Sequence, residues 1–212
     1  MQTRGRFITF EGIDGSGKTT QMRILAERLR REGREVLEAV EPGGTEVGSQ
    51  IRRILLDSAN QDLRPTAELL LYFASRAQNV EQCILPALSQ GKIVLCDRFT
   101  DSTLAYQGYG RGLGEETVLT LDRIACQGLA PDLTVLVDVD VDTGLARARV
   151  RNTGTAGSET RMDDQSLDFH RKVREAYLDL ARKHAGRFRI IDGRGTPETV
   201  AARVWESVAT HV

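Results

Sequence analysis

One eight-residue segment near the N-terminus constrains the fold of this 212-residue chain more than any other feature. The segment Gly12–Thr19 reads GIDGSGKT and matches the pattern G-x-x-x-x-G-K-[ST]. It follows the β-prone run Phe7–Phe10 and opens a helical pattern of apolar residues that stops at Gly33. Glycines in a strand-to-helix loop let successive backbone N–H groups point at phosphate oxygens, and the helix N-terminus adds positive potential. We therefore expect a nucleoside triphosphate to bind here, on Gly12, Ile13, Asp14, Gly15, Ser16, Gly17, Lys18 and Thr19.

Two side chains at the end of this loop carry expectations of their own. Lys18 can reach the β- and γ-phosphates, and the hydroxyl of Thr19 can hold Mg²⁺. The alternative is a glycine-rich turn that binds no ligand, but neither lysine nor threonine has a folding role at this spacing. The loop therefore predicts a bound nucleoside triphosphate with Mg²⁺.

Strand-like and helix-like segments alternate along the rest of the chain. Further strands are expected at Val36–Val40, Ile93–Cys96, Leu133–Val139 and Arg187–Ile191. Helices are expected through Val47–Leu55, over Thr66–Gln90 with a bend at Pro86, over Glu115–Gln127, and from Pro197 with Thr196 as N-cap. Unbroken apolar strands separated by helices are typical of a parallel sheet covered on both faces. The fold class is therefore α/β, with residues 1–212 in a single domain.

One segment interrupts this regular alternation. Asn152–Ser166 is rich in Gly, Ser and Thr and has no periodic apolar residues, although helical patterns flank it on both sides. We interpret it as a mobile lid within the domain.

Composition excludes several classes of protein. The net charge is −1, with 40% hydrophobic and 28% charged residues, so no electrostatic feature indicates a nucleic-acid partner. The longest apolar runs are far shorter than the ~20 residues that a membrane-spanning helix needs, and the N-terminus lacks the apolar core of a secretory signal. The three cysteines, Cys83, Cys96 and Cys126, have no CxxC spacing and are expected to be free thiols. We expect a cytoplasmic protein without a membrane partner.

The phosphate-binding loop alone is compatible with a GTPase, a motor or a small-molecule kinase. The base-reading NKxD motif of GTPases is missing, and one compact domain leaves little room for the coupling elements of a motor, so a kinase is favoured. Asp97 and Arg98 end a buried strand where the carboxyl ends of parallel strands open into a ligand crevice. Asp97 can order Mg²⁺ or the attacking oxygen, and Arg98 can clamp a phosphate. The alternative for this pair is a structural ion pair.

A nucleotide acceptor requires further cations and an aromatic surface. Arg52 belongs to the helix that follows Pro42-Gly43-Gly44, and Tyr72 and Arg76 share a helical face at i, i+4 spacing. Such a pair can stack on a base and hydrogen-bond to its edge. The alternative is that Tyr72 and Phe73 pack into the core and that Arg76 is a surface arginine.

Five separated motifs together resemble thymidylate kinases, in order and in spacing. They are Phe10–Thr19, Glu41–Thr45, Leu71–Arg76, Asp97–Phe99 and Ser102–Gly108. The resemblance implies a P-loop kinase fold, transfer of the ATP γ-phosphate to dTMP with Mg²⁺ to give dTDP for dTTP synthesis, and a homodimer.

The resemblance also implies roles for individual residues. Asp14 would hold the 3′-hydroxyl of the sugar, and Arg52 and Arg98 would hold the acceptor phosphate. Tyr72 would stack on thymine, with Phe73 counted among the substrate-binding residues.

The remaining acceptor residues are assigned in the same way. Arg76 would read thymine O4, and Thr103 would face the N3 side of the base with Gln107 nearby. The ring of Tyr106 would crowd the place of a ribose 2′-hydroxyl and so favour deoxyribose. Lys18, Asp97 and Arg98 would act in catalysis, with Thr19 and Asp97 at the metal.

Some members of the family carry a catalytic arginine in the P-loop and others in the lid. Gly15 occupies the P-loop position here, so the resemblance implies a lid arginine, chosen from Arg149, Arg151 and Arg161. Arg161 matches best, with Arg151 as a second catalytic candidate. Arg147 shares a helical face with Arg151 and can approach adenine or phosphates, and the alternative for these arginines is a solvated basic helix face.

Two other functions remain open from the sequence. One is phosphorylation of a different nucleoside monophosphate or of a deoxynucleoside. The other is a non-catalytic ATP-binding switch, against which the second cationic site of Arg52, Arg76 and Arg98 argues, because a switch needs no second anion site.

Overall fold

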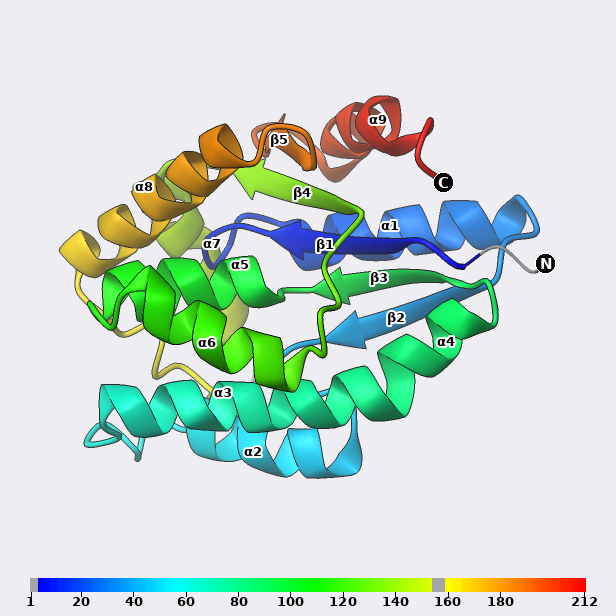
Figure 1. Cartoon of the computed structure of the whole chain (residues 1–212). Helices are drawn as coiled ribbons and strands as arrows, with labels where there is room; N and C mark the ends of the chain where they lie inside the picture. The colour runs from blue at the N-terminus through cyan, green and yellow to red at the C-terminus, as the bar shows by residue number, and fades with distance from the viewer. Residues whose placement is uncertain (1–3, 154–158) are drawn as a thin grey trace.

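Five parallel strands form the central sheet of the protein in a computed structural model, in the order β2-β3-β1-β4-β5 (Figure 1). The strands are β1 (Phe7–Glu11), β2 (Val36–Val40), β3 (Ile93–Asp97), β4 (Leu133–Asp138) and β5 (Phe188–Asp192). The structure describes residues 4–153 and 159–212, and only the backbone of 151–153. β1 and β3 are buried along their whole length, as expected of apolar strands in the middle of a covered parallel sheet.

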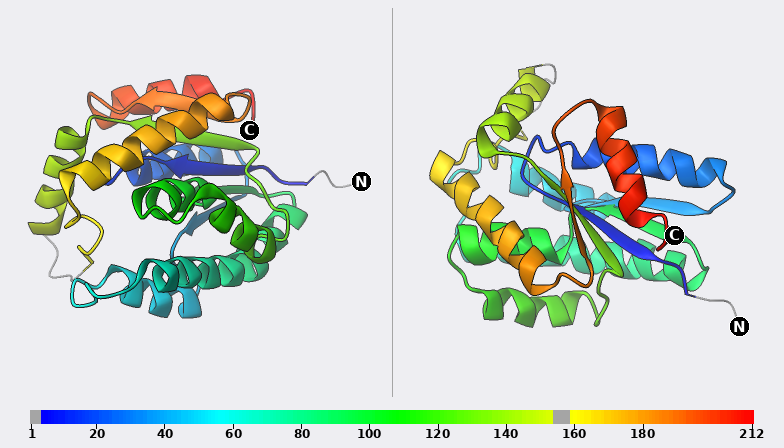
Figure 2. Two further views of the ribbon diagram at one scale, coloured as in Figure 1. Left: turned by 60° about the vertical axis from the view of Figure 1, so that its left-hand side comes forward. Right: turned by 90° about the horizontal axis from the view of Figure 1, so that it is seen from above.

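Helices cover both faces of this sheet. They are α1 (Lys18–Arg31), α2 (Glu46–Leu56), α3 (Pro65–Asn79), α4 (Leu85–Ser89), α5 (Thr100–Thr103), α6 (Glu115–Ala125), α7 (Val141–Thr153), α8 (Leu167–Lys183) and α9 (Pro197–Val208). Figure 2 shows α1 and α9 on one side of the sheet and α6 and α8 on the other. Alternate residues of β1 face the two sides, since Phe7 belongs to one buried apolar cluster and Ile8 and Phe10 to the other. The expected α/β fold with a doubly covered parallel sheet is confirmed.

The single helix expected over Thr66–Gln90 is divided into three consecutive segments in the structure. α3 passes into a π-helical turn at Val80–Ile84, and α4 follows with Pro86 in its first turn. A proline inside an α-helix lacks an N–H and clashes with the carbonyl four residues earlier. The π-helical turn lies just before Pro86, where a regular α-helix would meet this clash. A second π-helical segment, Leu104–Gly110, follows α5.

Part of the expected lid, Asn152–Ser166, can be located. α7 extends to Thr153, residues 154–158 lie outside the described residues, and α8 starts at Leu167 with the side chain of Ser166 as its N-cap. The backbone N–H of Arg161 donates to the carbonyl of Leu56, 3.2 Å away, which joins the end of this segment to α2. The mobility of the segment remains a prediction.

Cys96 and Cys126 are buried free thiols and Cys83 is half-buried. Within 4–153 and 159–212, none of the helices has the length and apolar character needed to cross a membrane.

Candidate active site

A cavity of about 480 Å³ opens at the carboxyl ends of β1, β2 and β3. Most of the side chains expected to contact ligands line it, namely Asp14, Lys18, Thr19, Arg52, Tyr72, Arg76, Asp97, Arg98, Thr103, Tyr106 and Gln107. They come from the loop before α1 and the first turn of α1, from α2 and α3, from the end of β3 and from the segment after it. The fold therefore brings the phosphate-binding loop and the expected acceptor residues to one cavity.

The predicted phosphate-binding loop connects β1 to α1. Gly15 has φ 72°, and a Cβ added there would lie 1.9 Å from the carbonyl oxygen of Gly144, so only glycine fits. The Oγ of Ser16 is buried and makes no hydrogen bond within the described part of the chain. An unpaired buried hydroxyl beside backbone N–H groups suits a phosphate oxygen. Burial and the neighbouring Arg98 lower the pKa of Lys18, while Asp97 and Asp14 oppose that shift.

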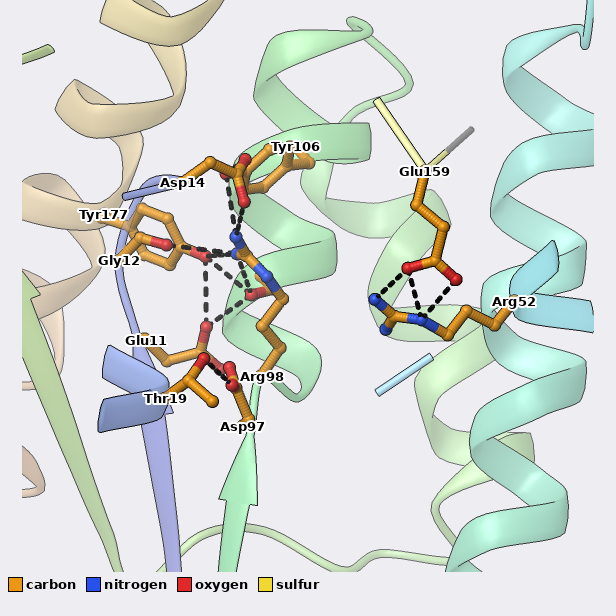
Figure 3. Close-up of polar contacts among 11 residues, drawn as sticks. Glu11, Gly12, Asp14, Thr19, Arg52, Asp97, Arg98, Tyr106, Glu159 and Tyr177 are labelled. Carbon is orange, nitrogen blue, oxygen red and sulfur yellow. Dashed lines mark hydrogen bonds and ion pairs between the residues drawn. The ribbon is translucent and has the colours of Figure 1, made fainter. Parts of the chain in front are cut away.

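The side chain of Thr19, in the first turn of α1, contacts that of Asp97, the last residue of β3. The Thr19 hydroxyl donates a hydrogen bond to the Asp97 carboxylate (Figure 3). Hydroxyl and carboxylate oxygens are hard donors of the kind that Mg²⁺ prefers. The two residues fit a magnesium ion that also binds the phosphates of a nucleotide.

Arg98 is the most highly connected side chain of the site. Its Nη2 donates to Asp14 Oδ1 at 2.7 Å and to the Tyr106 hydroxyl at 3.2 Å. Its Nη1 donates to the carbonyl of Gly12 at 3.1 Å (Figure 3). Burial would lower the pKa of Arg98, but the neighbouring Tyr106 and Asp14 raise it well above its ordinary value. Burial would likewise raise the pKa of Asp14, yet Arg98 and Lys18 hold it well below its ordinary value.

Arg76, on α3, also lines the cavity. It is only 1% exposed, so the alternative of a surface arginine is wrong. Its Nε donates to Glu41 Oε2 at 2.5 Å, and its Nη2 donates to Thr103 Oγ1 at 2.9 Å. Its Nη1 is buried and has no hydrogen-bond partner among residues 4–153 and 159–212. An unpaired donor of a cavity-lining guanidinium is a ready contact for a carbonyl oxygen.

Two predicted substrate-binding residues differ in their placement. Tyr72 is half-buried and lines the cavity. Phe73 is a buried member of the core, and the Arg76 guanidinium lies 5.0 Å from the centre of its ring. Phe73 does not line the cavity, because α3 turns adjacent residues to different sides, and it packs against Arg76 instead.

Arg52 is held by a residue that sequence reasoning missed. The carboxylate of Glu159 accepts hydrogen bonds from Nε of Arg52 at 3.2 Å and from Nη2 at 2.9 Å (Figure 3). Arg52 Nη1 also donates to the carbonyl of Pro42 at 3.1 Å. The two residues of this ion pair are 107 positions apart, so no local pattern predicts it.

Arg161, which the resemblance assigns to the transferred phosphate, does not line the cavity in this structure. Among the described residues, the cavity wall includes Glu159, Thr160 and Met162 from this segment but not Arg161. Arg161 is 2% exposed, with Nη2 2.7 Å from Glu68 Oε2 and Nε donating to the carbonyl of Leu55. A buried carboxylate attracts a nearby guanidinium strongly, which explains this position. The side chain of Arg151 lies outside the described residues.

Several buried carboxylates were not assigned a role from the sequence. Glu68 is 0% exposed and accepts hydrogen bonds from Gln107 at 2.8 Å and from Arg111 at 3.2 Å, in addition to pairing with Arg161. Glu41 pairs with Arg76, and Glu11 lies directly before the loop. One sequence pattern could have identified these carboxylates. Each belongs to a Glu at the carboxyl end of a strand or on the buried face of a helix, and a glutamate is rarely buried unless it is paired.

The fold and the cavity define a class of protein. A phosphate-binding loop that faces a second cationic site in one cavity is the arrangement of P-loop kinases, which move a phosphoryl group from a nucleoside triphosphate to a bound acceptor. The sequence model of one such family, thymidylate kinase, matches residues 10–204. This chain belongs to the thymidylate kinase family.

Individual relatives agree over nearly the whole chain. It is 54% identical over 201 residues to a thymidylate kinase of Pelobacter propionicus, which covers 94% of this chain and 92% of that protein. It is 48% identical over 209 residues to one of Geobacter sulfurreducens, with 98% of each covered. The crystal structure of thymidylate kinase from Ehrlichia chaffeensis superposes with a TM-score of 0.79 at 34% identity, covering 97% of this chain and 99% of that one. Membership of the family makes the chain a transferase that uses ATP as phosphoryl donor.

Proposed function

We propose that this protein transfers the γ-phosphoryl group of ATP to dTMP, which gives dTDP for dTTP synthesis. The observation that carries the proposal is the pairing of the phosphate-binding loop with the buried Arg76–Thr103 pair in one cavity. Phosphoryl transfer asks a protein mainly to align two substrates and to compensate charge. With the family established, another acceptor or a non-catalytic switch has no support.

The part of the cavity lined by Tyr72, Arg76 and Thr103, which we call the base end, supports thymine as the acceptor base. The buried Nη1 of Arg76 donates to thymine O4, and Tyr72 stacks on the ring. Thr103, already bonded to Arg76, faces the N3 side, with Gln107 held nearby by Glu68. A buried donor left unpaired costs about 1–3 kcal/mol, so a base with a carbonyl at this place is preferred over one with an amino group.

The sugar and phosphate lie between the base end and the loop. Asp14 accepts from the 3′-hydroxyl, and the Tyr106 ring occupies the space of a 2′-hydroxyl. Arg98 and Arg52 hold the acceptor phosphate, which takes the place of Asp14 or Glu159 as their anionic partner. Thr19 and Asp97 would hold Mg²⁺, which would supply charge compensation on the phosphates of ATP, and Lys18 contacts the same phosphates.

We assign the segment 152–166 as a lid of a single domain spanning 1–212, and the catalytic lid arginine to Arg151 or Arg161. The buried ion pair with Glu68 favours Arg151, because Arg161 would have to break that pair before reaching a phosphate. An arginine at the transition state contributes about 10³–10⁵ in rate in comparable systems.

The protein acts as a homodimer in the cytoplasm. Exposed apolar side chains support self-association: Val47 and Ile54 on α2, Leu70 on α3 and Ile124 on α6. α3 contacts both α2 and α6, and α2 and α3 lie lowest in Figure 1. Large exposed apolar patches mark protein interfaces, and these side chains are the candidates for one. The free thiols of the described cysteines suit a reducing compartment.

The proposal is tested by ADP release from ATP·Mg²⁺ with dTMP, dUMP, the ribose form of TMP, dCMP, AMP and GMP. A strong preference for dTMP is expected. Equal rates with dCMP or a purine nucleotide would overturn the assignment of the base end, and ATP binding without any transfer would restore the switch function.

A further inference from the structure

Glu11 is a buried carboxylate that the proposed catalytic machinery does not use. It ends β1, directly before the phosphate-binding loop, and is 0% exposed. Its Oε1 accepts a hydrogen bond from the backbone N–H of Phe99 at 2.8 Å. Its Oε2 accepts from the Ser102 hydroxyl at 2.5 Å and from the Tyr177 hydroxyl at 3.1 Å (Figure 3). Donors from the turn after β3, from α5 and from α8 therefore converge on one carboxylate.

The same two hydroxyl oxygens also contact Arg98. Arg98 Nη1 donates to Ser102 Oγ and to the Tyr177 oxygen, each at 3.1 Å. A hydroxyl has a single proton, and when that proton points at Glu11 the lone pairs of the oxygen face the guanidinium. Ser102 Oγ and the Tyr177 oxygen are also 2.7 Å apart, so a Tyr177 proton directed at Ser102 is still directed away from Arg98. An ionised Glu11 thus orients both hydroxyls as acceptors for Arg98.

The backbone at Arg98 depends on the same carboxylate. Arg98 has φ 72°, in the left-handed region that residues other than glycine rarely adopt. Such a conformation persists only where the surroundings hold it, and the N–H of the following residue, Phe99, is bonded to Glu11. Glu11 therefore restrains Arg98 at both ends, through the main chain and through the side chain.

We propose that Glu11 is a positioning residue that presents Arg98 to the acceptor phosphate, acting through the hydroxyls of Ser102 and Tyr177. The proposal rests on the role given above to Arg98. A neutral amide in place of the carboxylate would put an N–H donor toward the two hydroxyls, and these would then turn their protons toward Arg98.

The test is steady-state kinetics of the full chain at about pH 8, above the raised pKa of Glu11 of about 7, with Glu11→Gln, Ser102→Ala, Tyr177→Phe and their combinations. ATP affinity is measured in parallel without dTMP. Glu11→Gln is expected to lower kcat/KM for dTMP by roughly 10–100-fold, the effect of mispairing a buried polar contact. ATP affinity should change less than about twofold, because the phosphate-binding loop does not depend on these hydroxyls. Glu11→Gln is also introduced into a chain that already carries Ser102→Ala and Tyr177→Phe. Because the two hydroxyls that link Glu11 to Arg98 are then missing, Glu11→Gln should change the logarithm of kcat/KM by less than roughly a quarter of its effect in the wild type.

Three outcomes would overturn the proposal: an unchanged kcat/KM for dTMP, an equal loss of ATP affinity, or full additivity of the three substitutions. If Glu11→Gln does not fold, Tyr177→Phe alone still decides, since it must lower kcat/KM for dTMP by more than about twofold at constant ATP affinity. Arg98→Lys, measured in parallel, separates the role of Arg98 from the positioning role of Glu11. No effect of Arg98→Lys would refute the role of Arg98 itself, whereas a loss with Arg98→Lys and none with Glu11→Gln would refute only the positioning role.

Discussion

The carboxylate of Glu159 holds the guanidinium of Arg52 at the mouth of the cavity, with Oε2 2.9 Å from Nη2. Arg52 is proposed to bind the acceptor phosphate, and in this structure the carboxylate of Glu159 pairs with the same guanidinium. The acceptor phosphate must displace Glu159 before it can bind Arg52. This exchange gives the first prediction.

Replacing Glu159 by Gln should lower KM for dTMP. Both partners are partly exposed, and exposed ion pairs contribute about 0.2–1 kcal/mol, which corresponds to roughly a 1.5–5-fold lower KM. Initial-rate measurements over a range of dTMP concentrations test this. Asp168→Asn is the matched control, because it removes another exposed carboxylate that pairs with an arginine but does not line the cavity. A higher KM in Glu159→Gln would show that Glu159 helps the acceptor to bind.

Arg161→Ala should affect stability more than catalysis. Its removal leaves the fully buried Glu68 with Arg111 and Gln107 but without its closest cationic partner, at a cost of roughly 1–3 kcal/mol in the free energy of unfolding. Arg151→Ala should instead lower kcat by about 10³-fold or more with little change in Tm. Thermal denaturation and kcat measured on both variants separate the two roles. A large loss of kcat in Arg161→Ala at unchanged Tm would return the catalytic role to Arg161.

Two substitutions of Tyr106 should distinguish the role of its aromatic ring from the role of its hydroxyl group. The hydroxyl donates to Asp14 Oδ2 at 2.7 Å and accepts from Arg98, whereas the ring is proposed to exclude a ribose 2′-hydroxyl. Tyr106→Phe should lower kcat/KM for dTMP by roughly tenfold, since it removes hydrogen bonds to charged groups, and should retain the preference for deoxyribose. Tyr106→Ala should reduce that preference. The ratio of kcat/KM for dTMP to that for its ribose form measures it, and an unchanged ratio in Tyr106→Ala would refute the role of the ring.

Stability should fall as the pH rises through the ionisation of Glu11. Burial and the charge of Asp101 raise the pKa of Glu11 from 4.5 to about 7, against the opposing effects of Ser102, Arg98 and the Phe99 N–H. A carboxyl with a raised pKa in the folded state stabilises the fold while protonated, so its contribution is complete below about pH 4.5 and is lost as the pH rises through about 7. The slope is at most about 1.4 kcal/mol per pH unit.

Denaturant unfolding between about pH 5 and about pH 8, for the wild type and for Glu11→Gln, tests this dependence. Subtraction of the two curves removes the titration of other groups. As the pH rises, the free energy of unfolding of Glu11→Gln should increase relative to that of the wild type. Parallel curves would show that Glu11 titrates at its ordinary pKa.

The fold class and the place of the active-site cavity follow from local patterns in the amino-acid sequence. Apolar strands, helical periodicity and the Gly12–Thr19 loop are local patterns, and parallel strands place their carboxyl ends at one edge of a sheet. Residues that end strands or follow the loop, such as Asp97, Arg98 and Thr19, were therefore predictable as neighbours, and the structure places them around one cavity.

The partners of the polar and charged side chains depend instead on how distant segments pack. Arg161 could be assigned to a phosphate from the sequence, but the packing of its segment against α2 and α3 brings it to Glu68 instead. The partners Arg52–Glu159 and Glu11–Tyr177 are 107 and 166 positions apart. Pairing energies between buried charges depend on separation and on desolvation, and both are set by how distant segments pack rather than by the spacing of residues along the chain.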